Sequence, residues 1–211
     1  YTNEDLILVQ SPPRIAGNLY MWPPISDKKT TGTLEAHKNG FRYRTAKGQQ
    51  QLVMYKNIRL SILQHSKTEL STLIHFYLKK PILVNGKQTL HVQFFKQVMV
   101  SSYNLETGVS SRSDAAELSE EEHDRHVRKK INQEFSRFCK SIKEMDIPNA
   151  PDFEQPNRKL SFDGTIKNQV VTLYPMVSSL VAVQERPPFV MMIDDMDAVF
   201  FERVILSLKY F

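Results

Sequence analysis

Apolar residues in the first half of the chain come in four short groups separated by polar, Gly or Pro residues. The groups are Val53 to Ile58, Leu60 to Leu63, Leu70 to Leu78 and Leu90 to Phe94, and the separators are Lys47-Gly48, Ser66-Lys67, Lys79-Lys80-Pro81 and Asn85-Gly86. Separators about 8 to 12 residues apart are typical of an all-β barrel or sandwich. The pattern therefore predicts short antiparallel strands, with a hairpin at Asn85-Gly86.

The strongest local signal is Asn39-Gly40, which stands between residues 33–38 and 41–45. Asn-Gly between two strand-like segments predicts a two-residue type I′ hairpin turn. That turn would place Ala36 opposite Tyr43 on an apolar face. Glu35 would lie opposite Arg44 on a charged face.

The chain changes character after a Ser-rich segment, residues 101–117, which we expect to be a long mobile loop. Ser119 followed by Glu122 forms a capping box. An apolar stripe follows at helical spacing: Val127, Ile131, Phe135, Phe138, Ile142 and Met145. The spacing predicts one amphipathic helix over residues 119–145, with its stripe packed on a sheet.

Strand patterns resume after a Pro-rich linker at residues 148–159. They fall at Leu160 and Phe162, Val170 to Leu173, Leu180 to Val183, Phe189 to Ile193, and Val199 to Leu208. The order is therefore β segments, a helix, a linker and more β segments.

The length of 211 residues favours two domains of roughly 100 residues. The chain begins without a basic-then-apolar leader and ends in a strand-like pattern, so we expect a fragment. No apolar run approaches the roughly 20 residues of a membrane span. The single cysteine, Cys139, excludes an internal disulfide and favours cytosol or nucleus.

The net charge of +5 is unevenly distributed. Residues 28–96 hold thirteen Lys or Arg and two acidic residues, a net charge of +11, whereas residues 148–211 carry a net charge of −2. Such a concentration of positive charge favours an acidic polymer as partner. A solvated surface that serves only solubility remains the alternative.

Several segments in order resemble one known family. They are Gly32 to Tyr43, Tyr55-Lys56-Asn57-Ile58, Leu73 to Lys79, Val92-Gln93-Phe94-Phe95, Leu160 to Gly164, Pro187-Pro188-Phe189-Val190 and Phe201 to Lys209. Together they resemble the middle domain of the large subunit of FACT, a histone chaperone complex. The resemblance covers nearly the whole chain.

The resemblance implies a mainly β fold with one helix, built from tandem pleckstrin-homology-like barrels. The first domain would span residues 1–147 and include the helix. After the linker at 148–159, the second would span residues 160–211 and lack its closing helix. The family engages core histones without catalysis.

Enzyme and metal sites find little support in the sequence. His123 and His126 lie one helical turn apart, but a closed metal site needs ligands from another element. Asp194, Asp195 and Asp197 lack the Gly and Glu of a calcium loop. Cys139 follows Phe138 on the helix and is expected to be a packed, inert thiol. We therefore predict no enzyme activity, no metal and no cofactor.

The candidate binding residues are taken from the basic stretch, one aromatic residue and the acidic cluster of the second half. They are Lys28, Lys29, Arg42, Arg44, Lys79, Lys80, Lys87, Trp22, Asp194, Asp195 and Asp197. Trp22 is an expected exposed contact residue. Lys38, Arg42 and Arg44 could instead bind an inositol phosphate, although a two-residue turn offers no loop to enclose one. Because histones are basic, the aspartates are the natural candidates for histone contact.

These observations lead to one functional hypothesis. The chain is expected to be a chromatin module in the nucleus that binds core histones and nucleosomal DNA. It would assist nucleosome disassembly and reassembly during transcription, replication and repair, and the small high-mobility-group-type FACT subunit would bind outside this chain. The alternative is a DNA- or phosphoinositide-binding adaptor that uses the basic face of the first barrel.

Overall fold

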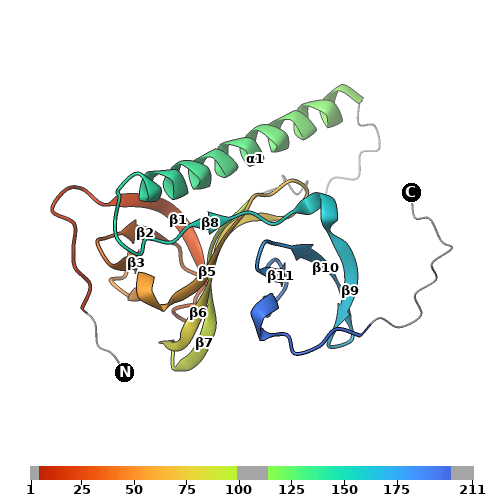
Figure 1. Ribbon diagram of the computed structural model, residues 1–211. Coiled ribbons are helices and arrows are strands. Elements are labelled where there is room, and N and C mark those ends of the chain that lie inside the picture. Colours follow the sequence, from red (N-terminus) through yellow and green to blue (C-terminus); the bar gives the residue numbers. More distant parts are fainter. Residues whose placement is uncertain (1–4, 99–113, 201–211) are drawn as a thin grey trace. The chain divides into compact units, whose positions relative to one another are not determined.

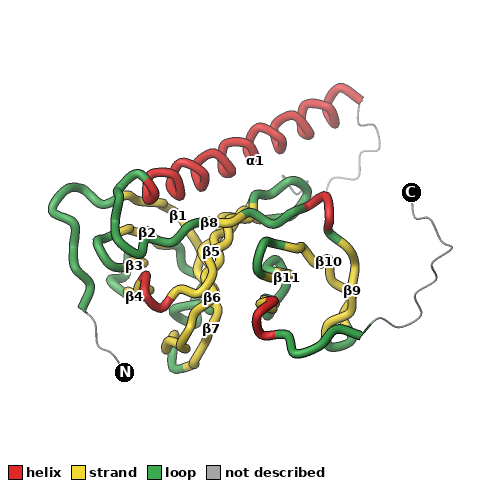
Figure 2. The backbone as a smooth tube through the Cα atoms, viewed as in Figure 1, coloured by secondary structure: helices red, strands yellow, loops and turns green. Residues whose placement is uncertain are grey.

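The computed structural model describes residues 5–98 and 114–200. The chain divides into two compact units, residues 1–156 and 157–211, and each unit has its own β-sheet. Figure 1 labels the elements and Figure 2 colours them by type. Both sheets are mainly antiparallel, and α1 is the one α-helix of the described residues. The mainly β prediction with one helix is therefore confirmed.

The first unit contains eight strands, one 3-10 helix and the α-helix. They are β1 (Arg14–Trp22), β2 (Gly32–Ala36), β3 (Gly40–Thr45), β4 (Gln50–Met54), η1 (Tyr55–Asn57), β5 (Ile58–Gln64), β6 (Ser71–Val84), β7 (Lys87–Gln97), α1 (Asp114–Lys143) and β8 (Phe153–Glu154). The strand order is β4-β3-β2-β1-β7-β6-β5-β8. Strand β1, which the sequence pattern missed, joins the two halves of the sheet because it pairs with both β2 and β7.

The hairpin at Asn39-Gly40 differs from its prediction. Ala36 pairs with Phe41, Glu35 pairs with Arg42, and the His37 N–H donates to the Gly40 carbonyl oxygen at 2.9 Å, so the turn is centred one residue earlier, on Lys38-Asn39. The Asn39 side chain accepts a hydrogen bond from the Ile7 N–H at 2.8 Å, and the Tyr55 N–H donates to the Asn39 carbonyl oxygen at 2.9 Å. These tertiary contacts hold the shifted turn. The predicted faces survive because a shift of two residues keeps every side chain on its own side of the sheet.

The predicted separator at Lys79-Lys80-Pro81 lies inside one long strand, β6. The pairing of β6 with β7 shifts register between Tyr77 and Ile82, so these residues form a β-bulge. A bulge tolerates Pro because that residue has no N–H to donate to the ladder. The hairpin at Asn85-Gly86 is confirmed: both residues are left-handed, with φ of 46° and 75°, and Val84 pairs with Lys87.

Helix α1 begins five residues before the predicted capping box at Ser119, and it ends at Lys143 rather than at 145. The Ala115-Ala116-Glu117-Leu118 segment consists of good helix formers, so the helix extends through it. Residues 114–117 are thus helical and not part of the predicted loop, and residues 101–113 of that loop lie outside the described part. The predicted linker, residues 148–159, contains a short strand, because Phe153 pairs in parallel with Ser61 of β5.

The predicted apolar stripe of α1 packs into the core of the first unit. Ile131, Phe135, Phe138 and Ile142 are buried there, and Val127 packs against them. Met145 follows the end of α1. The helix contacts β1 and β6, and the predicted docking of the stripe on the first sheet is confirmed.

Aromatic residues from separate elements meet in this core. The ring of Phe41 stacks on Phe76 and meets Tyr55 edge-on, each with centroids 4.9 Å apart. Tyr43 donates a hydrogen bond to the Leu19 carbonyl oxygen at 2.8 Å. Burial raises the pKa of Tyr43 to about 12, so its hydroxyl stays protonated and keeps this bond.

Gly32 occupies a site with no room for a side chain. A Cβ there would lie 2.6 Å from Tyr43 Cζ and would also collide with the Arg44 carbonyl oxygen. We expect Gly32→Ala to lower the free energy of unfolding by about 1 to 3 kcal/mol, as overpacking does. At Gly17 an added Cβ meets nothing within 4 Å, so Gly17→Ala should cost less than about 0.5 kcal/mol. Equal urea midpoints for the two variants would contradict this account.

The second unit contains four strands in the order β12-β11-β10-β9. Its elements are η2 (Arg158–Leu160), β9 (Phe162–Ile166), β10 (Gln169–Pro175), β11 (Ser179–Ala182), β12 (Phe189–Met192) and η3 (Ile193–Asp195). Val171, Leu173 and Ala182 form its core. Leu160 ends a 3-10 helix instead of starting a strand. The strand predicted at Val199 to Leu208 lies mostly outside the described residues.

Candidate functional site

The loop after β1, residues 23–31, carries the first pair of predicted lysines. With β1 and β7 it encloses a pocket of about 290 Å³. Tyr20, Trp22 and Phe95 line the pocket, and the Tyr20 and Phe95 rings lie 5.6 Å apart. The Lys29 ammonium lies 4.7 Å from the Tyr20 ring centroid. Because Trp22 is half-buried in this wall, it is not the exposed residue that the sequence predicted.

The same loop is tied to the β6–β7 hairpin. Asn85 Nδ2 donates a hydrogen bond to Asp27 Oδ1 at 3.3 Å. Lys87 follows this hairpin turn directly, and its side chain is exposed. The structure thus brings Lys87 to the end of the first unit that also holds Lys28 and Lys29.

The bulge of β6 carries a second group of lysines. Lys79 Nζ donates to the Lys56 carbonyl oxygen at 3.0 Å, and Asn57 Oδ1 accepts from the Lys80 N–H at 2.9 Å. These bonds fix the bulge against η1. Lys56, Lys79 and Lys80 are all exposed, so the bonds between the bulge and η1 bring the backbones of three exposed lysines together.

Arg42 forms an ion pair with Glu35. Its Nε lies 2.7 Å from Glu35 Oε2, and His37 Nε2 lies 3.2 Å from the same oxygen. Partial burial raises the pKa of Glu35, but hydrogen bonds from Arg42 and His37 and the charges of Arg42 and Arg44 outweigh it and hold that pKa below its usual range. Arg42 is therefore neutralised, which weakens the predicted inositol phosphate cluster of Lys38, Arg42 and Arg44.

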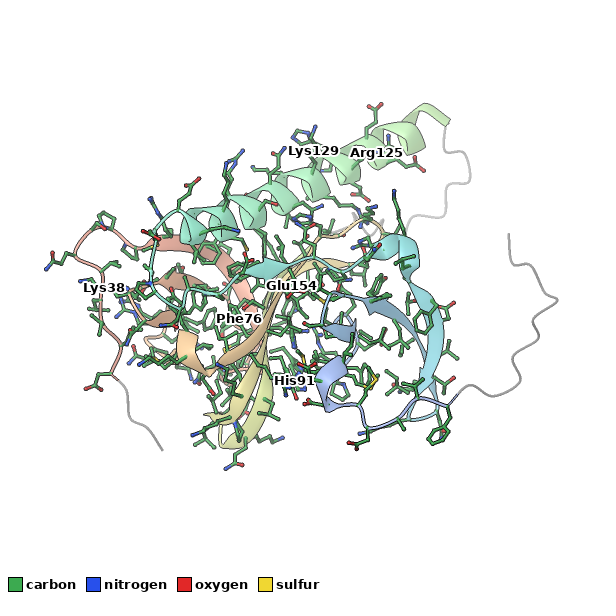
Figure 3. The ribbon with its side chains drawn as sticks, in the orientation of Figure 1. Lys38, Phe76, His91, Arg125, Lys129 and Glu154 are labelled. Atoms are coloured by element: carbon green, nitrogen blue, oxygen red, sulfur yellow. The ribbon has the colours of Figure 1, made fainter. Side chains whose placement is uncertain are left out.

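The outer face of α1 is a basic surface that the sequence reasoning missed. Its exposed cations are Arg125, Lys129, Lys130, Arg137, Lys140 and Lys143, and Figure 3 shows Arg125 and Lys129 along the helix. Over residues 125–143 the only acid is Glu134, and it is paired with Lys96 at 2.9 Å. The signal was available, because these cations lie opposite the apolar stripe at helical spacing.

The predicted acidic residues belong to the second unit. Asp194, Asp195 and Asp197 lie in and just after η3, and all three are exposed. His123 and His126 are exposed on α1. Across the described residues, no group of three or more His, Cys, Asp or Glu is arranged to hold a metal ion. Within the same residues, no helix combines the length and apolar character needed to cross a membrane.

Cys139 is buried beside the core, and burial raises the pKa of its thiol to about 12. The predicted packing of this thiol is confirmed, and because the thiolate is the reactive form, the raised pKa supports the prediction that it is inert.

We expect this thiol to react slowly with a disulfide reagent in the native chain and fast in denaturant. The chain holds no other cysteine, so the absorbance change reports this residue alone. Equal rates in the two conditions would mean that the packing of α1 on the sheet does not shield Cys139.

Comparison with known proteins identifies the family of the chain. The model of the FACT complex subunit SPT16 PH-like domain matches residues 15–142, which include β1 to β7 and nearly all of α1. The chain belongs to this family. FACT SPT16 PH-like domains are a non-catalytic class, in agreement with the prediction that the chain is not an enzyme.

Relatives extend the match over the rest of the chain. FACT complex subunit SPT16 of Dictyostelium discoideum is 35% identical and covers 100% of this chain. The protein of the same name from Arabidopsis thaliana is 34% identical over 97% of the chain, and FACT complex subunit spt-16 of Caenorhabditis briggsae is 34% identical over 92%. The chain spans only 19% to 21% of the length of these relatives.

One solved structure, that of the Spt16D Pob3N heterodimer, covers 90% of this chain and 79% of its own with a TM-score of 0.39 and 10% identity. That likeness is too low to add to the family assignment.

Proposed function

We propose that this chain is a histone-binding module of a FACT complex in the nucleus. It binds core histones and helps to take nucleosomes apart and rebuild them during transcription, replication and repair. The observation that carries this proposal is membership of the FACT SPT16 PH-like family, together with relatives about 34% identical over nearly the whole chain. The small high-mobility-group-type FACT subunit would bind to regions outside this chain.

The distribution of charge supports separate binding surfaces for histones and for DNA. Histones are basic, so the lysine groups of the first unit are a poor primary site for them. Asp194, Asp195 and Asp197 are exposed on the second unit, whose six basic and six acidic residues balance, so that it lacks the positive excess of the first unit. We propose these aspartates for histone contact, and the lysine groups and the outer face of α1 for the phosphates of nucleosomal DNA.

We also propose that the second unit is a second pleckstrin-homology-like barrel without its closing helix. Supporting this, each unit contains four consecutive strands in an antiparallel meander, followed directly by a one-turn 3-10 helix. The residue before that turn is Met54 in one case, with φ −77° and ψ 136°, and Met192 in the other, with φ −78° and ψ 138°. The domains would then be residues 1–147 and 160–211.

The rival function is an adaptor that binds DNA or a phosphoinositide through the basic surface alone. The lysine groups favour it, because they would bind any polyanion. It predicts duplex binding that weakens steeply with salt and no affinity for histones.

Equilibrium binding of each labelled core-histone pair to the chain tests the proposal. The variant Asp194→Asn/Asp195→Asn/Asp197→Asn should bind at least about tenfold more weakly, because it loses the charges that face basic histones. The matched control, Glu121→Gln/Glu122→Gln/Asp124→Asn, removes the same charge from α1 and should bind like the parent. No histone binding by the parent would overturn the proposal. Equal loss in both variants would overturn the assignment to the aspartates.

A further inference from the structure

A second groove of the first unit lies between β1 and α1, apart from the lysine groups. It encloses about 400 Å³, within the usual range for binding pockets of roughly 300 to 1,000 Å³. Leu19, Phe135 and Phe138 lie buried beneath its floor, the exposed Ile15 supplies apolar surface at its edge, and Figure 1 shows α1 running across β1. The groove therefore has the size and lining to accept one large apolar side chain.

An irregularity of β1 opens this groove. The pairing of β1 with β2 shifts register between Ala16 and Leu19, and Asn18 between them is left-handed with a φ of 57°. Gly17 faces open space, because a Cβ there would meet nothing within 4 Å. The Ile15 side chain is 62% exposed at the groove. The irregularity thus leaves Gly17 and Asn18 outside the ladder with β2, next to the exposed Ile15 side chain at the groove.

The charges at the groove that lack a partner are both positive. Arg14 and Arg137 line it from β1 and α1, and both are exposed. Among the described residues, neither guanidinium has a hydrogen-bond or ion-pair partner in the structure. The remaining ionisable group, Glu134, is held by Lys96 at 2.9 Å, so its charge is balanced. Two unpaired arginines beside an apolar floor attract carboxylates and repel basic histone segments.

We propose that this groove binds an acidic peptide segment of a partner protein, in which one large apolar residue is flanked by carboxylates. The apolar residue packs against Ile15, above the floor formed by Leu19, Phe135 and Phe138. The flanking carboxylates pair with Arg14 and Arg137. This site shares Arg137 with the face of α1 proposed for DNA, but it goes beyond the proposed function because its partner is an acidic peptide with an apolar residue, which is neither a histone nor DNA.

The test uses a fluorescein-labelled peptide with a central phenylalanine flanked by aspartates, titrated with the whole chain. Arg14→Glu/Arg137→Glu should weaken binding at least about tenfold, because both carboxylate partners become repulsive. The matched control Lys159→Glu/Lys167→Glu makes the same change of charge on two exposed residues of the second unit, and it should change the affinity less than about twofold. Urea midpoints of both variants check that each is folded.

Two further probes make the outcome decisive. A peptide with alanine in place of phenylalanine should bind at least about tenfold more weakly, since it buries no large apolar side chain. NMR shifts on peptide binding should concentrate at Leu19, Phe135 and Phe138. No binding of the phenylalanine peptide, equal binding of the alanine peptide, or equal loss in the two protein variants would overturn the proposal. Histone binding by the Arg14→Glu/Arg137→Glu variant should match the parent, so this result is separate from the proposed function.

Discussion

Phe135→Ala is expected to lower the free energy of unfolding of the first unit by about 3 to 5 kcal/mol, which is the usual cost of truncating a buried aromatic residue. Phe135 is 2% exposed and lies in the core that α1 shares with the sheet. The substitution removes the ring and leaves a cavity beside Phe138. Urea denaturation followed by the fluorescence of Trp22, the single tryptophan, measures the effect.

Gln133→Ala is the matched control for this variant. Gln133 lies on the same helix with an exposed side chain, so its truncation should change the free energy of unfolding by less than about 0.5 kcal/mol. If the midpoints of Phe135→Ala and the parent coincide, α1 does not anchor the first unit through its apolar stripe.

Reversal of Lys28, Lys29, Lys79 and Lys80 to Glu should sharply reduce binding to duplex DNA. Each phosphate contact that is lost should lower the slope of log affinity against log salt by about 0.9. Histone binding should fall much less, because a basic surface repels histones and is not their primary site. The measurement is a salt series of binding constants for duplex DNA and for each histone pair.

The two lysine pairs can also be reversed separately, which separates the loop after β1 from the bulge of β6. Lys159→Glu/Lys167→Glu makes the same change of charge on two exposed residues of the second unit, and DNA affinity should hardly change. Unchanged DNA binding in the fourfold variant would show that the two lysine pairs are only a solvated surface. Equal loss for DNA and histones would show that both ligands share one surface.

Features that depend on local chemistry were predictable from the sequence. The stripe of Ile131, Phe135 and Phe138 repeats at helical spacing, and it packs in the core as expected. The Asn85-Gly86 turn needs two left-handed residues, and these two residue types adopt that conformation with little strain. The inward and outward faces of β2 and β3 follow from strict alternation of side chains.

Features that depend on distant contacts were not predictable. The shifted turn at Lys38-Asn39 is held by Ile7 and Tyr55, which no local pattern connects to it. The bulge at Lys79-Lys80-Pro81 keeps β6 continuous across a Pro that normally ends a strand.

The candidate site was only partly predictable for a similar reason. Counting charge along the sequence found the lysines of residues 28–96. It missed the outer face of α1, where Arg125, Lys129 and Lys130 come together only once the helix is formed. The ion pair of Arg42 with Glu35 depends on the actual register of β2 and β3, which the predicted turn placed two residues away.

Competition for histones between this chain and duplex DNA tests the central claim most directly. A labelled histone pair is first bound to duplex DNA at physiological salt, and the chain is then added while free and bound DNA are separated by electrophoresis. A histone-chaperone module should release DNA as its concentration rises and should itself be recovered with the histones. Release without histone capture, or capture of DNA alone, would contradict the account and favour a polyanion-binding adaptor.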